Sequence, residues 1–165
     1  MITIRNSEIS DLPELLRIYN YEVENGVATL DIHPQTIEER KKWFDAHGSG
    51  NHPLITAVED GEIAGYASLS SYRDKEAYSS TVELSVYVAP EHRRRGIAVK
   101  LMEHLIDFAK NDSSTHCVVS VITSGNEASV KLHEKFGFAY CGTVPEVGEK
   151  FGRYLDIVNY ALIVK

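Results

Sequence analysis

The segment from Thr81 to Leu101 constrains the fold more than any other, because its hydrophobic period changes within a few residues. From Thr81 to Val88 apolar and polar residues alternate, which is the period of a strand with one buried and one usable face. Pro90 ends that strand, since proline has no amide proton to donate to a ladder. From Ala98 onward apolar residues recur at helical spacing. We therefore expect a strand that passes through a tight turn directly into a helix.

The turn between this strand and this helix carries three arginines and a glycine, Arg93 to Gly96. Free amides at the start of a helix, the helix dipole and nearby guanidinium groups together favour a phosphate-bearing ligand. Glycine lets the backbone approach such a ligand closely. The turn therefore predicts an anion site facing a strand with one carboxylate, Glu83. The alternative is a basic loop that is simply solvated.

Length, charge and cysteine content narrow the class of protein. The 165 residues suffice for a sizeable core, and we expect one domain over residues 1–165. A formal net charge of -7 argues against a general nucleic-acid binder. Cys117 and Cys141 lie in apolar runs without metal-ligand spacing, which predicts buried reduced thiols and no metal site. With no signal peptide and no membrane-spanning apolar run, we expect a cytoplasmic protein without membrane contact.

The other elements follow from hydrophobic periods, caps and turn dipeptides. Strands are predicted at 2–5, 54–59, 62–70, 117–122, 138–144 and 154–164, with a polar turn at 148–153 between the last two. The apolar run at 117–122 predicts a strand buried on both faces. Further helices are predicted after caps at Ser10 or Asp11, Thr36 and Asn126. This order implies an α/β architecture, a mixed sheet with helices on both faces.

Several short motifs resemble a known family. R-x-x-G-x-A after V-Y-V resembles the coenzyme A fingerprint of the GNAT superfamily of N-acetyltransferases. T-V-E-x-S-V-Y-V, L-H-E and G-x-K-F-G resemble its phosphinothricin acetyltransferase branch, above all the methionine sulfoximine and methionine sulfone acetyltransferases. The resemblance covers nearly the whole chain, and departs at Tyr154 and Ala98, where tryptophan and glycine are common. It implies a GNAT fold of about seven strands and about four helices.

The resemblance also implies which residues bind acetyl-CoA. The pantetheine arm would pair, as an added strand would, with the backbone of Val86, Tyr87 and Val88. The pyrophosphate would be held by the amides of Arg94, Arg95, Gly96, Ile97, Ala98 and Val99. Asn126, at the start of a later helix, would bind the cofactor by its side chain, serve as a plain helix cap, or do both.

Two residues are candidates for catalysis. Glu83 is the expected general base, because an α-amine with a pKa of roughly 8 is mostly protonated at neutral pH and must be neutral to attack a thioester. The alternative is a solvent-facing strand residue. The resemblance places His133 where many relatives outside this branch carry the tyrosine that protonates the departing thiolate. It could act as an acid or hydrogen-bond donor, or be purely structural.

The acceptor site is expected near the polar segment that leads into the Glu83 strand. Candidate substrate-binding residues there are Arg73, Glu76, Ala77 and Tyr78. A cation at that place would suit an α-carboxylate or a phosphinate, the alternative being a solvated loop. Lys150 and Arg153 lie in a region that the resemblance places near the pocket and near the contact of a homodimer, and either use is open.

These features predict an enzyme that moves an acetyl group from acetyl-CoA to the α-amine of a small amino acid or glutamate analogue by direct attack. Phosphinothricin, methionine sulfoximine and methionine sulfone are the acceptors that the resemblance implies. One alternative keeps the chemistry but acetylates a protein N-terminus or a polyamine. Another is a regulatory module that binds acyl-CoA without turnover, and the presence of Glu83 argues against it.

Overall fold

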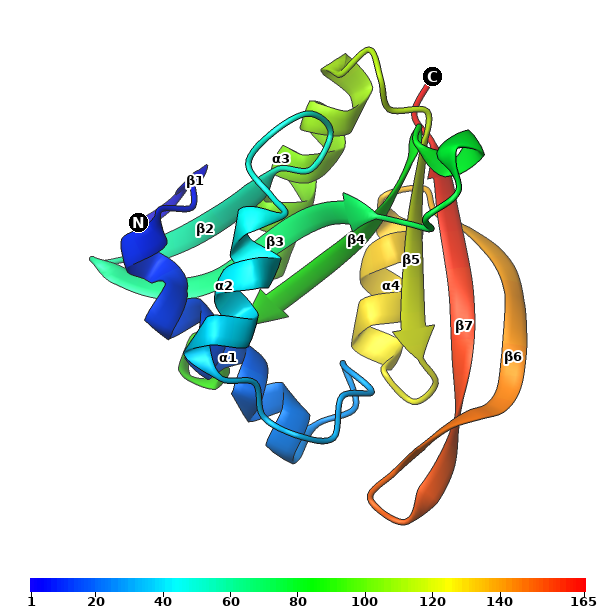
Figure 1. The fold of residues 1–165 in the computed structure, drawn as a ribbon, viewed down its shortest axis with the longest axis horizontal. Coiled ribbons are helices and arrows are strands. Elements are labelled where there is room, and N and C mark those ends of the chain that lie inside the picture. Colours follow the sequence, from blue (N-terminus) through cyan, green and yellow to red (C-terminus); the bar gives the residue numbers. More distant parts are fainter.

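The computed structural model describes residues 1–165 and is built on a seven-stranded sheet with the order β1-β2-β3-β4-β5-β7-β6 (Figure 1). The strands are β1 (Ile2–Asn6), β2 (Leu54–Glu59), β3 (Glu62–Ser71), β4 (Thr81–Val88), β5 (Cys117–Thr123), β6 (Ala139–Lys150) and β7 (Arg153–Ile163). Neighbouring strands are antiparallel except β4 and β5, which are parallel. The predicted mixed sheet is therefore confirmed.

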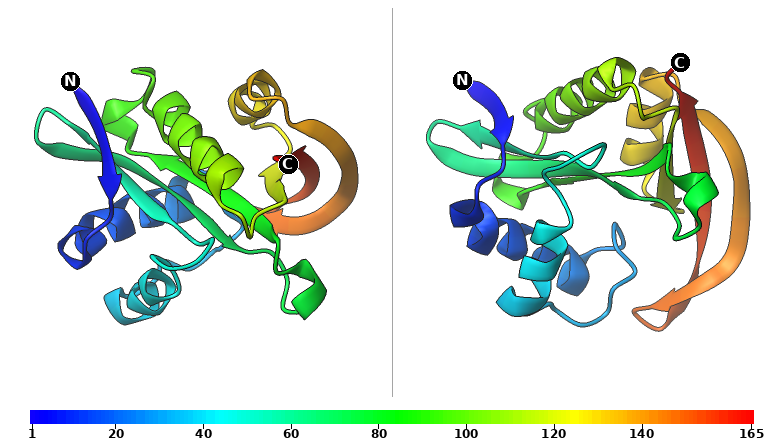
Figure 2. Two further views of the ribbon diagram at one scale, coloured as in Figure 1. Left: turned by 90° about the horizontal axis from the view of Figure 1, so that it is seen from above. Right: turned by 45° about the horizontal axis from the view of Figure 1, so that its top comes forward.

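Helices cover both faces of the sheet, as predicted. They are α1 (Leu12–Asn25), α2 (Ile37–Asp45), α3 (Ile97–Asn111) and α4 (Glu127–Lys135), with short 3₁₀ turns at Ile9–Asp11, Glu76–Tyr78 and Pro90–His92. Helices α1 and α2 lie on one face, and α3 and α4 lie on the other (Figure 2). None of the helices has the length and apolar character needed to cross a membrane.

Two of the predicted caps differ in outcome. Thr36 forms the expected capping box at the start of α2, where its hydroxyl accepts from the Glu39 amide at 3.2 Å. Asp11 precedes α1, but its carboxylate does not cap that helix. It turns back toward the preceding residues instead, where it pairs with the Arg5 guanidinium at 2.7 and 2.9 Å and accepts from the Glu8 amide at 2.8 Å.

The sheet separates two hydrophobic cores. The larger core packs α3, through side chains such as Leu101 and Leu105, against Val82 and Leu84 of β4. The smaller core packs α1 against the opposite face, where Tyr66 is fully buried and Tyr87 of β4 lies against it. The alternation predicted for 81–88 is thus confirmed, although part of its polar face serves as core rather than as a free surface.

Strand β5 is not buried on both faces, so that prediction is wrong. Val118 and Ile122 are buried, whereas Val121 on the other face is 40% exposed. Helix α1 packs against β3 and β4, and no helix covers the corresponding face of β5 (Figure 2). The predicted burial of the thiols is wrong as well. Cys141 is exposed on the edge strand β6, and Cys117 is only half-buried.

The last two strands form a longer hairpin than the sequence indicates. The polar segment 148–153 was predicted to be a turn, but β6 continues to Lys150 and β7 begins at Arg153. Phe151 and Gly152 alone make the turn, with φ angles of 54° and 72°. Two positive φ angles match the twist of a two-residue hairpin, so the polar residues on either side remain in the ladder.

Candidate active site

The candidate site is a cleft that opens where β4 and β5 separate. The parallel pairing of these strands covers only Thr81–Glu83 and Cys117–Val119, although both strands continue beyond it (Figure 1). A cleft of about 750 Å³ occupies the gap. Beyond Glu83 the edge of β4 that faces β5 has no strand partner. Its free N–H and C=O groups can therefore pair with an extended ligand, as an added strand would.

The cleft brings together residues that lie far apart in the sequence. The predicted site residues among its lining are Glu83, Val86, Tyr87, Val88, Ala98, Asn126 and His133. Arg94, Arg95, Gly96, Ile97 and Val99 lie beside it, in the turn before α3 and the first turn of that helix. Arg93, the first arginine of the predicted basic turn, also lines the cleft, as do Glu22 and Ser120, which the sequence analysis did not single out.

The predicted substrate-binding residues lie outside this lining. Arg73, Glu76 and Ala77 are exposed, and Tyr78 is half-buried, on the loop between β3 and β4. The Arg73 guanidinium lies 4.9 Å from the centre of the Tyr72 ring and 5.8 Å from that of Tyr78. This loop leaves β3 next to Ser70, which is paired with Glu83 across the sheet. Contact between this loop and an acceptor stays a prediction.

The turn before α3 has the backbone of an anion site. Arg94 and Gly96 have φ angles of 62° and 80°, and Gly96 precedes a helix that has no side-chain cap. Left-handed residues within a short turn bring successive amide groups to one side. A Cβ added at Gly96 would meet no atom within 4 Å, so the glycine borders open space. The backbone of this turn is therefore compatible with the predicted anion site.

Glu83 has the properties of a base. Its side chain is half-buried in the cleft and forms no hydrogen bond or ion pair with another group of the protein. Burial raises the pKa of this carboxyl above its usual value. A carboxylate with a raised pKa and no cation to neutralise it accepts protons more readily than a surface glutamate does.

His133 also borders the cleft, but both of its ring nitrogens are occupied. Nδ1 donates to the Ser129 carbonyl at 2.7 Å, so Nε2 accepts from the Ser120 hydroxyl at 2.8 Å. Only 4% of the residue is exposed, and burial lowers the pKa of the imidazole. A neutral ring with no free N–H has no proton to give to a thiolate. These contacts favour the structural alternative for His133, while its catalytic role stays a prediction.

Comparison with known proteins agrees with this geometry. The model of the acetyltransferase (GNAT) family matches residues 15–138. This chain belongs to that family. An L-methionine sulfoximine/L-methionine sulfone acetyltransferase of Pseudomonas paraeruginosa is 41% identical over 156 residues, which cover 94% of this chain and 90% of the relative. A phosphinothricin N-acetyltransferase of Streptomyces coelicolor is 41% identical over 162 residues, which cover 96% of this chain and 94% of the relative.

A solved structure extends the similarity to three dimensions. The crystal structure of a GNAT superfamily phosphinothricin acetyltransferase from Sinorhizobium meliloti in complex with AcCoA is 31% identical and superposes with a TM-score of 0.94. The match covers 98% of this chain and 88% of the other. The predicted family, fold and enzyme class are therefore confirmed.

In this GNAT acetyltransferase an aromatic stack supports the open edge of β4. The Arg40 guanidinium lies 3.9 Å from the centre of the Tyr19 ring and 3.5 Å from that of Trp43, and only 3% of Arg40 is exposed. It donates to the Tyr66 hydroxyl at 2.6 Å, and the Tyr66 ring stacks on Tyr87 at 5.4 Å. Arg40 stands among charged residues of α2, so nothing local distinguishes it from a solvated arginine.

The tip of the β6–β7 hairpin reaches the opposite wall of the cleft. Only 3% of Lys150 is exposed, and its amine donates to the carbonyls of Thr29 at 2.8 Å and of Glu22 at 3.4 Å. Glu22 and Thr29 both line the cleft. Of the two uses left open for Lys150, this contact supports the pocket. Arg153 is exposed.

Proposed function

We propose that this acetyltransferase moves the acetyl group of acetyl-CoA to the α-amine of a small free amino acid. The acceptors we propose are methionine sulfone, methionine sulfoximine and phosphinothricin, for which the two relatives at 41% identity are named. The observation that carries the proposal is the position of Glu83. This carboxylate has a raised pKa and faces a cleft bordered by an open strand edge and, beyond it, by a basic turn.

The cleft suits acetyl-CoA in shape and in chemistry. The open edge of β4 at Val86–Val88 offers main-chain partners to the amides of a pantetheine arm. The turn at 94–96 and the first amides of α3 offer donors to a pyrophosphate. Asn126 uses its Oδ1 to accept from the Ser129 amide at 3.4 Å, which leaves its NH₂ group for the cofactor. Asn126 is thus suited to serve as cap and ligand at once.

The proposed reaction is a single direct transfer. Glu83 takes a proton from the acceptor ammonium group, through a water molecule if the two are not in contact, and leaves a neutral amine. The amine nitrogen forms a bond to the thioester carbonyl carbon, and the carbon–sulfur bond breaks. The electron pair leaves with the sulfur, and the nitrogen gives up its second proton to the thiolate, which yields the amide and free coenzyme A. Glu83 then releases the first proton to solvent. Holding the amine against the thioester supplies much of the rate.

The substrate assignment is tested by steady-state thiol release across a panel of amines. We expect each of the three amino acids to have a higher kcat/KM than spermidine or a peptide with a free N-terminus. An acidic protein gains no long-range steering of anionic acceptors, so their recognition has to be local. Faster turnover of the polyamine or the peptide than of all three amino acids would refute the assignment but not the acetyltransferase activity.

Arg73→Ala is expected to raise the acceptor KM by about tenfold to a hundredfold, the scale of one lost charge-assisted hydrogen bond. The KM for acetyl-CoA should stay within about twofold of wild type, because only the acceptor loses a partner. Lys75→Ala, on the same exposed loop, is the matched control. The same panel assay measures both variants, and an unchanged acceptor KM for Arg73→Ala would remove this loop from the site.

We also propose that the protein is a homodimer that associates through the β6–β7 hairpin. Large apolar side chains are exposed there, at Tyr140, Val144, Val147, Phe151 and Tyr154. An exposed cluster of this kind is typical of a protein interface. Sedimentation velocity should give twice the chain mass of 18.5 kDa, and Val147→Lys should shift the protein toward the monomer. A monomeric wild type at micromolar concentration would contradict the proposal.

The remaining expectations are a cytoplasmic location and the absence of nucleic-acid, membrane and metal partners. They rest on the acidic composition and on the sequence patterns, and they stay predictions.

A further inference from the structure

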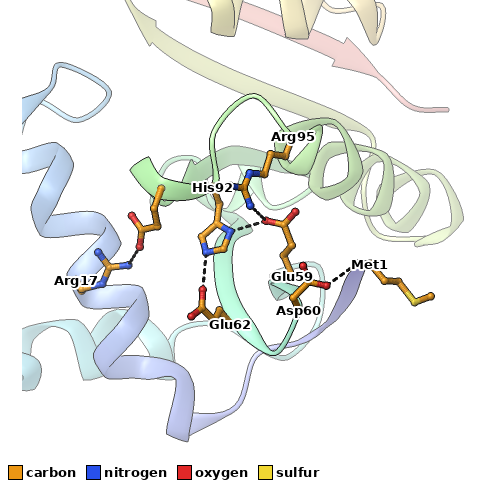
Figure 3. Close-up of polar contacts among 8 residues, drawn as sticks. Met1, Arg17, Glu59, Asp60, Glu62, His92 and Arg95 are labelled. Atoms are coloured by element: carbon orange, nitrogen blue, oxygen red, sulfur yellow. Dashed lines mark hydrogen bonds and ion pairs between the residues drawn. The ribbon is translucent and has the colours of Figure 1, made fainter.

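The segment that precedes α3 is fastened on both sides by ion pairs. Toward α1, Glu91 pairs with Arg17 at 2.5 Å, and Arg93 pairs with Glu22. Toward the β2–β3 hairpin, the Arg95 guanidinium contacts the Glu59 carboxylate at 3.0 Å (Figure 3). Of the three consecutive arginines, Arg94 alone has no ion pair within the protein.

Glu59 holds two residues of this segment at once. Its Oε2 accepts from Arg95 and lies 2.6 Å from Nδ1 of His92, which in turn has Nε2 3.4 Å from Glu62 (Figure 3). The side chains of Glu59 and His92 are 12% and 7% exposed. The Glu59–His92 contact is therefore screened less by solvent and salt than the Glu59–Arg95 pair, whose arginine side chain is 52% exposed. The hydrogen bond from His92, with a further one from Arg95, lowers the pKa of the Glu59 carboxyl, which keeps it ionised.

These contacts bear on the backbone of the turn. Arg94 has a φ of 62°, a left-handed conformation that is unfavourable for a residue with a side chain, so surrounding contacts have to maintain it. Glu59 contacts a residue on each side of Arg94, namely His92 before it and Arg95 after it. Arg95 is also absent from the lining of the cleft, since its side chain is turned toward Glu59.

We propose that Glu59 is a positioning residue for acetyl-CoA: it fastens His92 and Arg95 so that the amides of residues 94–96, and not the Arg95 guanidinium, face the pyrophosphate. The inference rests on the placement of the pyrophosphate at this turn under the proposed function. Glu59 itself touches neither substrate nor reacting atoms and acts through the turn.

The sign of the effect separates positioning from simple charge. A carboxylate near a phosphate site repels the ligand, so a merely electrostatic Glu59 would weaken binding, and its removal would lower the KM for acetyl-CoA. A positioning Glu59 predicts the reverse. Glu59→Gln should raise the KM for acetyl-CoA by about tenfold, while kcat and the acceptor KM stay within about twofold.

Glu62→Gln is the matched control. It removes a carboxylate that contacts the same imidazole, but this side chain is 76% exposed and has no pair with Arg95. We expect its KM for acetyl-CoA to stay within about twofold of wild type. Arg95→Gln removes the other end of the Glu59 pair, and it should shift the KM for acetyl-CoA in the same direction as Glu59→Gln does. It is the second variant to measure if Glu59→Gln proves hard to purify.

S-acetylpantetheine, which lacks the phosphates and the nucleoside, distinguishes this role from a general loss of structure. Wild type and Glu59→Gln should use it equally well, because it does not engage the turn. An unchanged or lowered KM for acetyl-CoA in Glu59→Gln would overturn the proposal, and so would an equal defect with S-acetylpantetheine. The placement of the pyrophosphate is tested separately, by calorimetry on Gly96→Val. Loss of binding there with a normal Glu59→Gln would overturn the positioning role alone.

Discussion

Replacing Glu83 with glutamine is expected to lower kcat at pH 7 by roughly 10²–10⁴-fold, the usual scale for loss of a general base. Glutamine keeps the size and shape of the side chain but cannot accept the proton of the acceptor ammonium group. Because Glu83 lies at the start of the open edge of β4 and binds no protein group, acetyl-CoA affinity should remain near wild type. Steady-state thiol release and calorimetric titration with acetyl-CoA measure the two quantities.

The dependence on pH gives the prediction a second readout. The defect of Glu83→Gln should shrink as pH rises, because more of the acceptor amine is then already neutral. In the wild type, burial raises the pKa of Glu83, so kcat/KM should begin to fall at a higher pH on acidification than a surface carboxylate would allow.

The same shift in the pKa of Glu83 fixes the sign of the effect on stability. A carboxyl whose folded pKa lies above its unfolded value favours folding when it is protonated, and this contribution is lost as pH rises through the folded pKa. At pH 7 the ionised form is therefore a cost, and Glu83→Gln should unfold at the same temperature as wild type or higher. Glu103→Gln, an exposed carboxylate on α3, is the control. If Glu83→Gln kept full activity at pH 7, the general base would have to be another group, and the predicted loss of kcat would be wrong.

Gly96→Val is expected to abolish acetyl-CoA binding while the fold is retained. Gly96 has a φ of 80° and borders open space, so a valine would put its branched side chain where the pyrophosphate is proposed to lie. It would also strain the left-handed backbone at a cost of about 1–3 kcal/mol, and so disturb the amides of residues 94–96. Calorimetric titration with acetyl-CoA measures the loss.

Gly48→Val separates the two causes. Gly48, in the loop between α2 and β2, has a φ of 94° and likewise no atom within 4 Å of an added Cβ. It should therefore lose a similar amount of stability in thermal unfolding but bind acetyl-CoA as wild type does. Undiminished acetyl-CoA affinity in Gly96→Val would show that the turn does not bind the pyrophosphate.

Features set by residues close together in the chain could be predicted from the sequence, whereas features set by distant contacts could not. The two strands predicted at 54–59 and 62–70, the Thr36 cap and the strand–turn–helix at 81–101 all depend on residues close together in the chain, and all were predicted correctly. The predictions that failed concerned exposure. Burial of β5 and of Cys141 depends on which elements cover a strand, and a strand's own sequence does not state that.

The amino-acid sequence by itself determined the family and the fold class, and it proposed the anion site at the turn before α3 and Glu83 as the base, because short contiguous motifs and local hydrophobic periods carry this information. Only the tertiary structure decided where β4 and β5 separate, since strand pairing joins segments more than thirty residues apart. It also decided that Arg40 is buried beneath Tyr66 and that Glu59 holds His92 and Arg95. A buried charged residue and a solvated one look the same in the sequence, and only the packing of distant elements, which sets the exposure of each charge, tells them apart.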